Sequence, residues 1–160
     1  MLHGETFDQL IDPGRALNPA STLIHGIQPE LLAGQPRIER VLPQFHRFCE
    51  DTVLVAHNAA FDMRFLQLKE TATGKRFSQP VLDTLMLSAV VHPRQLHHSL
   101  EAIAARLGIN IIGRHTALGD AIVTGEIFLQ LIPLLEAQGI KTLQQARQAS
   151  QRTPYAHVQY

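Results

Sequence analysis

The stretch VAHNAAFDMRFL, residues 55–66, joins the end of a short β-branched run to the start of a helical pattern. The run TVLVA, residues 52–56, predicts a strand, and Asn58 suits the N-cap of the helix that follows. Asp62 then falls in the first turn, where the helix dipole favours a carboxylate without any function. The stretch therefore allows two interpretations. Its polar residues either stabilise the helix start without any function, or include a ligand in a metal-dependent active site.

Similar patterns elsewhere predict an alternation of short strands and helices. The stretch GETFDQLID, residues 4–12, alternates apolar and polar side chains and predicts a strand that closes at the turn signal DPG. The stretch FSQPVLDTLMLS, residues 77–88, predicts another short strand that runs into a helix near Asp83. Strands and helices in alternation indicate an α/β domain.

Apolar residues at helical spacing predict the helices. The main helix of the first set is expected to begin at Pro43, with proline at its first position, and Pro133 is expected to kink or break the longest helix, which follows Thr116. The apolar sets are Ile38, Val41, Leu42, Phe45 and Phe48 on one helical face, Phe61, Phe65, Leu68 and Ala72 on an expected buried face, and Leu118, Ile122, Gly125, Leu129 and Ile132 at helical spacing; the expected caps are Ser99, Gly108 and the Thr142–Gln145 box.

The composition is that of an ordinary globular domain. The chain has 160 residues, 45% hydrophobic and 18% charged, enough for one domain with a real core and a polar tail after Ser150. We expect no signal peptide, no segment long and apolar enough to span a bilayer, and a buried thiol at Cys49. These features favour a cytoplasmic protein. The formal net charge is zero, so a nucleic acid would have to be held by metal ions or a local basic patch.

Two segments share one spacing: HNAAFD, with His57 and Asp62, and HTALGD, with His115 and Asp120. In the second segment the histidine precedes a predicted helix and the aspartate lies about one turn inside it. A neutral imidazole can take a proton from water near pH 7, and a carboxylate can hold Mg²⁺. Together they suit metal-assisted hydrolysis of a phosphate ester.

Structural roles explain the same residues when each is taken alone. Carboxylates near helix N-termini are favoured by the dipole. His57, directly after a strand, is expected to be buried and hydrogen-bonded, and the pair His97–His98 is expected to be a solvated helix entry. Because the chain has a single cysteine, a zinc site of the Cys/His type is excluded. Spacing alone favours these structural interpretations.

The combination of segments, in this order, resembles the DEDDh 3′–5′ exonucleases, which include the proofreading subunit of bacterial DNA polymerase III and ribonuclease T. LVAHNAAFDMRFL is similar to the second motif of that family and RHTALGDAIVTGEIFLQL to the third. The stretches LDTLMLS and LEAIAARLGI resemble the segments between them, and FDQLIDPGRALNPASTLIHGI resembles the edge strand and the loop near the nucleotide pocket. The resemblance covers nearly the whole chain and implies a ribonuclease H-like α/β fold, with an exonuclease domain over residues 3–150 and a tail over 151–160.

The resemblance also implies a chemistry and a partner: two divalent metal ions, Mg²⁺ or Mn²⁺, and hydrolysis of single-stranded DNA or RNA from its 3′ end to 5′-mononucleotides. By position, Asp120 is implied to bind the more tightly held metal and Asp62 to act on the second. His115 is implied to be the general base that activates water. The implied nucleotide-binding residues are Ile24, His25, Asn58 and Phe61, whereas Asp83 matches a recurrent, non-catalytic position.

The first family motif, an Asp-x-Glu at the end of a central strand, has no counterpart. It is expected upstream of GETFDQLID, where the sequence holds only Met1, Leu2 and His3, and Glu5 and Asp8 do not form the pattern. The expected fold therefore lacks its first two strands and two of its four carboxylates. We expect a fragment of a longer protein or a misassigned start, rather than a degenerate form that pairs with a partner.

Three functional hypotheses follow. The chain is a metal-dependent 3′–5′ exonuclease domain with little activity alone; or it is a catalytically inactive relative that binds a nucleic acid or a protein; or it is an inert piece of a multidomain protein. Without its neighbour, the segment ETFDQLID is expected to be an exposed edge, to pair with TVLVA, or to pair with a second chain, so homo-oligomers or fused domains are expected partners.

Overall fold

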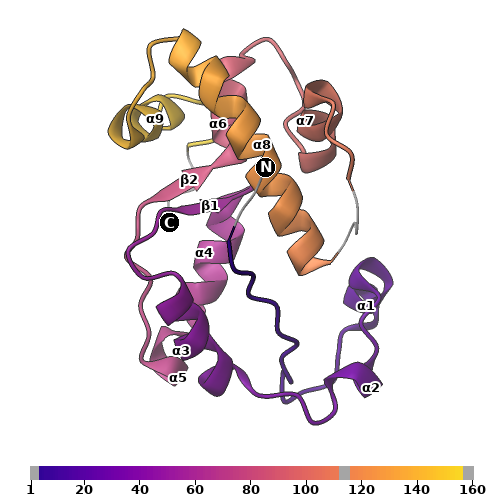
Figure 1. Ribbon diagram of the computed structural model, residues 1–160. Coiled ribbons are helices and arrows are strands. Elements are labelled where there is room, and N and C mark those ends of the chain that lie inside the picture. The colour runs from indigo at the N-terminus through magenta and orange to yellow at the C-terminus, as the bar shows by residue number, and fades with distance from the viewer. Residues whose placement is uncertain (1–3, 112–115, 157–160) are drawn as a thin grey trace.

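The computed structural model describes residues 4–111 and 116–156 (Figure 1). Its strands are β1 (Leu54–Ala56) and β2 (Val81–Asp83). Its helices are α1 (Pro19–His25), α2 (Pro29–Leu32), α3 (Ile38–Phe48), α4 (Ala59–Leu68), α5 (Glu70–Thr73), α6 (Thr84–Val91), α7 (Leu100–Leu107), α8 (Ala117–Ala137) and α9 (Leu143–Ser150). The predicted strands over 52–56 and 77–88 and the predicted helices after them are confirmed.

The two strands form a parallel pair in which Leu54 lies opposite Val81 and Ala56 opposite Asp83. The chain reaches the second strand through the crossover segment that carries α4 and α5. Because the strands are parallel, their carboxyl ends meet at one edge of the sheet. Residues that directly follow β1 and β2 are therefore placed side by side, and α4 and α6 both start there.

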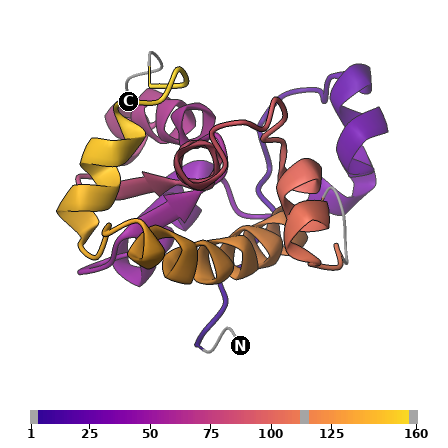
Figure 2. The ribbon, with the colours of Figure 1, turned by 90° about the horizontal axis from the view of Figure 1, so that it is seen from above.

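The main core lies between the sheet and the C-terminal helices. α8 packs against α6, α7 and β1, and Figure 2 shows it lying lengthwise beside the two strands. Leu87, Ile103, Ile127 and Leu131 are completely buried in this core. The burial of such side chains stabilises the fold by about 1.5–3 kcal/mol each, which fixes α8 and the start of α6 relative to the sheet.

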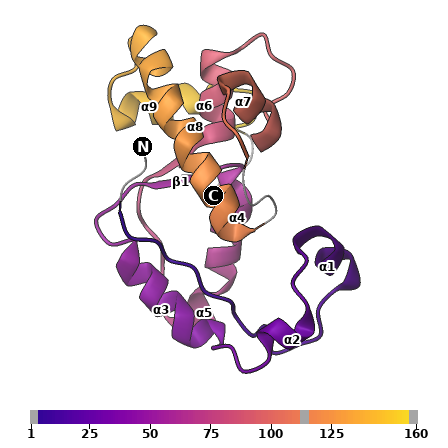
Figure 3. The same ribbon diagram turned by 45° about the vertical axis from the view of Figure 1, so that its right-hand side comes forward.

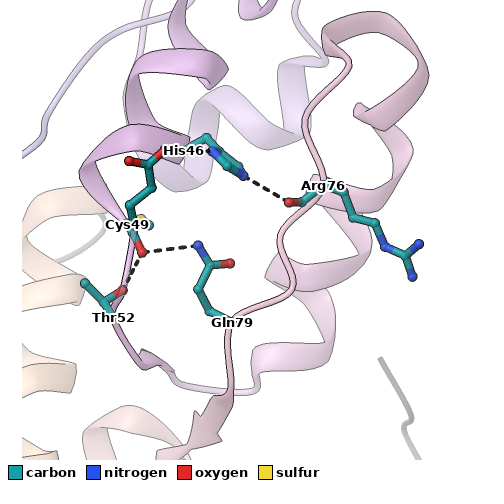
Figure 4. A network of polar contacts seen from close by, with 6 residues as sticks. His46, Cys49, Thr52, Arg76 and Gln79 are labelled. Atoms are coloured by element: carbon teal, nitrogen blue, oxygen red, sulfur yellow. Dashed lines mark hydrogen bonds and ion pairs between the residues drawn. The ribbon is translucent and has the colours of Figure 1, made fainter.

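A second core joins α3 to the loop before β2. Its buried side chains include Leu42, Cys49, Met63 and Phe77. The carbonyl of Cys49 accepts hydrogen bonds from Thr52 Oγ1 (2.8 Å) and Gln79 Nε2 (3.1 Å), as Figure 4 shows. In the same figure the His46 ring donates to the carbonyl of Arg76, 3.0 Å away, while the Arg76 guanidinium points away. Cys49 is the buried thiol expected from the sequence, and burial raises its pKa.

The two prolines lie inside their helices. The expected helix start at Pro43 is wrong, because α3 begins at Ile38. α8 continues past Pro133, so the break expected there is absent, while the kink stays a prediction. A proline inside a helix costs about 3 kcal/mol because it removes a hydrogen bond and crowds the preceding turn. Both helices bury apolar side chains within two residues of their prolines, Leu42 in α3 and Leu131 in α8, and this burial offsets the cost.

The segment over residues 4–12 is not the strand that its alternation predicts. Within the described residues it forms only an isolated bridge, between Asp12 and Arg37, and it does not pair with β1. Its position is fixed instead by Phe7, whose ring lies 5.3 Å from that of Phe45 and 5.7 Å from that of Phe48. A period of two defines a strand only where a neighbouring strand accepts its hydrogen bonds.

The helices α1 and α2 project from the rest of the fold, as Figures 1 and 3 show. α1 starts at an N-cap in which the Asn18 side chain accepts from the backbone N–H of Ala20. It contains no buried residue, and Leu23 is 88% exposed. α1 therefore holds its shape by local capping rather than by packing.

The expectation that no segment is long and apolar enough to span a bilayer is wrong for α8. This helix has 21 residues, and an 18-residue window within it has a mean hydropathy of 1.5, so it is long and apolar enough by length and composition. Its apolar character has a local explanation, since Val123, Ile127 and Leu131 form the centre of the main core. Core helices commonly pass the same test, so the finding is weak support for a membrane segment.

Candidate active site

The junction between β1 and α4 is capped by a residue from the neighbouring strand. Asn58 occupies the N-cap position with a left-handed backbone, φ 57° and ψ 50°, but its side chain makes no capping hydrogen bond. The carboxylate of Asp83 accepts from the backbone N–H of Asn58 (3.0 Å) and of Ala59 (3.0 Å) instead. The expectation that Asn58 caps the helix is thus right for its position and wrong for its side chain.

His57 points back into the fold at the same junction. Its Nδ1 lies 3.0 Å from the hydroxyl of Thr84, the first residue of α6, which is completely buried. Burial lowers the pKa of His57, an effect that the nearby charges of Asp83 and Glu101 partly oppose. The expected hydrogen bond is confirmed, while His57 is only partly buried rather than buried as expected.

A cleft of about 420 Å³ opens beside this junction. It is lined by His57, Asn58, Leu85, Ser99, Leu100, Glu101, Ile111 and Asp120. The parallel strands explain part of this set, because His57 and Asn58 follow β1 and Leu85 follows β2. Asp120 comes from the first turn of α8, whose N-cap is the Thr116 side chain. The structure thus brings Asp120 together with two residues of the HNAAFD segment.

Asp62 lies on the exposed side of the first turn of α4 and is absent from the lining of this cleft. Neighbouring protein atoms displace part of its hydration shell, which raises the pKa of the Asp62 carboxyl. A backbone hydrogen bond partly opposes this effect, and the charge of Asp83 adds to it. A cation near Asp62 would offset the repulsion between the negative charges of Asp62 and Asp83. Convergence of Asp62 and Asp120 on one site remains a prediction, and His115 lies outside the described residues.

Among the described residues, the candidate ligands are of the type that divalent metals prefer, but they are too few to hold two ions. Carboxylate oxygens such as those of Asp62 and Asp120 are the ligands that Mg²⁺ and Mn²⁺ prefer. Over residues 4–111 and 116–156, however, no three His, Cys, Asp or Glu side chains converge on a point that could hold a metal ion. Two carboxylates are too few for a pair of divalent ions, which repel each other and must both lose water.

The predicted buried face of α4 is wrong. Phe61, Phe65 and Leu68 are 65%, 54% and 60% exposed, whereas Ala59 and Met63 face the core. The rings of Phe61 and Phe65 lie 5.2 Å apart and form an exposed aromatic pair beside Asp62. Helical spacing correctly groups these side chains on one face, but it cannot say whether another part of the protein covers that face.

The predicted nucleotide-binding residues Ile24 and His25 lie at the end of α1. Ile24 is 67% exposed, and His25 Nδ1 accepts a hydrogen bond of 3.0 Å from the backbone N–H of Ile27. Ile24 is therefore open to solvent, while His25 helps to shape the turn after the helix. Neither residue lines the cleft that holds Asp120.

A family model for exonucleases of the RNase T type matches residues 1–128. The chain belongs to this exonuclease family. It is 52% identical over 141 residues to a DNA polymerase III subunit epsilon-like protein of Rhodobacter capsulatus, a match that covers 87% of this chain and 20% of the relative. It is 35% identical over 152 residues to a PolC-type DNA polymerase III of Thermotoga maritima, which covers 94% of this chain and 11% of the relative. The exonuclease chain thus spans a fifth or less of the length of these two relatives.

The fold agrees with this family. A solved structure of exonuclease X in complex with 5′ overhanging duplex DNA superimposes with a TM-score of 0.69 at 25% identity, covering 88% of this chain and 78% of that one. The resemblance to DNA polymerase III epsilon-like exonucleases and the ribonuclease H-like α/β fold are both confirmed. Exonucleases of this family generally use divalent metals; the number of ions at this site remains a prediction.

Sequence reasoning missed the structural importance of Asp83. It noted only that this position recurs in the family, yet the side chain is 4% exposed and holds the starts of both α4 and α6. A signal was present, since an aspartate at the end of a predicted parallel strand lies at the same sheet edge as the end of its neighbour.

Proposed function

We propose that this chain is the exonuclease domain of a longer cytoplasmic protein and removes 5′-mononucleotides from the 3′ end of single-stranded DNA or RNA. The observation that carries the proposal is the cleft at the carboxyl ends of β1 and β2, which gathers His57, Asn58 and Asp120 in a chain of the exonuclease family. The naming of the relatives as DNA polymerase III proteins and the duplex DNA bound to exonuclease X support a nucleic-acid substrate.

The proposed roles follow from the charges that hydrolysis creates. Cleavage of a phosphodiester develops negative charge on the attacked phosphate and on the leaving 3′ oxygen, and bound divalent ions neutralise that charge. Asp120 and Asp62 would hold these ions, and His115 in its neutral form would accept a proton from the attacking water. Asn58 and Phe61, both exposed at the start of α4, would contact the terminal nucleotide, with Ile24 and His25 of α1 on its other side.

The same charges predict low activity for the chain alone. Asp62 and Asp120 supply two negative charges against the four of two divalent ions, and neutral His115 adds none. We propose that an Asp-x-Glu segment, the first motif that the family resemblance implies, completes the site when it is supplied in one chain or as a complementing piece.

The decisive test uses a 3′-labelled oligonucleotide of DNA or RNA with Mg²⁺ or Mn²⁺. We expect the 160-residue chain to release labelled nucleotide very slowly, and an added Asp-x-Glu segment to restore 3′-directed release. His115→Ala in the completed protein should reduce the rate by about 10²–10⁴-fold, the usual contribution of a general base. His97→Ala is the matched control, because His97 is exposed and lies outside the cleft.

Two outcomes would contradict this account in different ways. Fast release by the 160-residue chain alone that depends on His115 would overturn the proposal that the site is incomplete. Absence of release even with the added segment, together with retained binding of the oligonucleotide, would instead favour the second candidate function, a nucleic-acid-binding relative without activity. The absence of any three-residue metal cluster in the described residues is the observation that keeps this second candidate open.

A further inference from the structure

Asp83 makes two kinds of hydrogen bond, one local and one long-range. Its Oδ1 accepts from the N–H of Leu85, 2.9 Å away, which is the ordinary N-cap of α6. The same oxygen also accepts from the N–H of Asn58, and its Oδ2 accepts from the N–H of Ala59, both at 3.0 Å and from more than 20 residues away in the sequence. A single buried carboxylate therefore binds the starts of two helices: α6, of which Asp83 is the N-cap residue, and α4, which follows the neighbouring strand.

This arrangement changes what Asn58 can do. An asparagine at an N-cap normally accepts, with its side-chain oxygen, from the N–H of the second or third helical residue, here Ala60 or Phe61. The Asn58 side chain forms no such bond, and the N–H of Phe61 donates to the Asn58 carbonyl instead, 3.1 Å away. Asp83 binds two other groups, the N–H of Asn58 itself and that of Ala59. Asn58 instead lines the cleft with His57 and Asp120. Its left-handed backbone, unfavourable for most residues, is held by the hydrogen bond from its own N–H to Asp83.

We propose that Asp83 is a positioning residue of the exonuclease site: by accepting from the N–H groups of Asn58 and Ala59, it holds Asn58 in the left-handed conformation that places this residue at the cleft, and it sets the direction of the helix turn that carries Asp62. The inference rests on the proposed function for its purpose, but the hydrogen bonds on which it depends are independent of any activity. Asp83 acts through the backbone of Asn58 and Ala59 and has no contact with the substrate in this scheme.

Two substitutions separate the long-range role from the local one. Asp83→Ser keeps a good N-cap for α6, because serine can still accept from Leu85, but its single oxygen cannot also reach Ala59. Asp83→Asn keeps the size of the side chain, but its NH₂ group must face one of the N–H groups that the carboxylate now accepts from. Thr142→Ala is the matched control, because it removes the side-chain cap of α9, a helix whose residues are absent from the cleft lining.

Amide hydrogen exchange of the 160-residue chain gives the first readout. In Asp83→Ser, the Ala59 N–H should exchange on the order of 10–100 times faster, the factor expected for loss of a hydrogen bond to a charged group. The Leu85 N–H should stay protected, and Thr142→Ala should leave both unchanged. Unchanged exchange at Ala59, or equal acceleration at Ala59 and Leu85, would overturn the long-range role.

The second readout is the NMR signal of the Asn58 side-chain amide when the chain, completed by the added Asp-x-Glu segment, is titrated with dTMP and Mg²⁺. If Asp83 holds this group at the nucleotide site, dTMP should shift the signal in the unsubstituted chain and in Thr142→Ala, and much less in Asp83→Ser and Asp83→Asn. An equal shift in all four proteins would contradict the positioning role. A lack of any shift in the unsubstituted chain would count against Asn58 as a nucleotide contact, and hence against the proposed site, while the exchange data still decide the capping role.

Discussion

His98 shows how a single side chain can differ from its sequence context. The pair His97–His98 suggests a solvated helix entry, yet His98 is only 5% exposed. Its Nε2 lies 3.1 Å from the carbonyl of Gln95, which can only accept, so this nitrogen carries the proton. Nδ1 then accepts from the Ser88 hydroxyl at 2.9 Å, and Arg106 donates to that hydroxyl at 3.3 Å. Both nitrogens of the neutral imidazole therefore have partners, whereas a protonated ring would add a second positive charge near Arg106.

This network predicts a loss of stability in mild acid. Burial lowers the pKa of His98, and the positive charges of Arg106, His92 and His97 lower it further, against a raising contribution from Gln95. As the pH falls through the ordinary histidine pKa of about 6.5, the unfolded chain takes up the proton first. The stability that neutral His98 contributes is therefore complete above about pH 6.5 and declines below it. Urea unfolding at pH 7.5 and 5.5 measures the decline, which should be smaller in His98→Gln; equal declines would exclude His98 as its source.

At the scale of elements, the sequence predicted best what depends on a few neighbouring residues. The caps at Ser99, Gly108 and the Thr142–Gln145 box are all present, because each involves groups within one helical turn. The helix start expected at Pro43, the break expected at Pro133 and the strand expected over 4–12 were wrong for the opposite reason. Their outcome depends on what packs or pairs against them from elsewhere in the chain.

The helix α8 offers a test of how its burial supports the fold. Leu131 is completely buried in the main core, whereas Leu129, two residues earlier on the same helix, is 39% exposed. Leu131→Ala should lower the free energy of unfolding by about 2–5 kcal/mol, because it removes buried methyl groups and leaves a cavity. Leu129→Ala has the same helix propensity change and should cost clearly less. Urea denaturation of the two variants checks the difference; equal costs would contradict the packing of α8 against α6 and α7.

At the scale of the whole molecule, the candidate site was only partly predictable. Parallel strands that end at one edge explain why His57 and Asn58 lie beside the end of β2, but Asp120 reaches the same cleft through the packing of α8 against α6, α7 and β1. The position of Asp83 at the end of a strand signalled that it lies near the end of β1, but its hydrogen bonds to Asn58 and Ala59 depend on the strand register, which sets Asp83 opposite Ala56. Exposure of Phe61, Phe65 and Leu68 could not be foreseen either, since periodicity identifies an apolar face but not what covers it.

That exposed face predicts concentration-dependent association of the chain. Phe61, Phe65 and Leu68 form a contiguous apolar stripe along α4, and apolar surface of this kind favours contact with another surface in water. Static light scattering across a concentration series should show an apparent mass that rises above 17.8 kDa. Phe65→Glu should reduce the rise, because a charge in the stripe must lose its water for the surfaces to meet. Leu96→Glu is the matched control, since Leu96 is 85% exposed and lies outside α4. A mass that stays at the monomer value at high concentration would contradict the prediction, because it would show that the exposed stripe on α4 does not drive association.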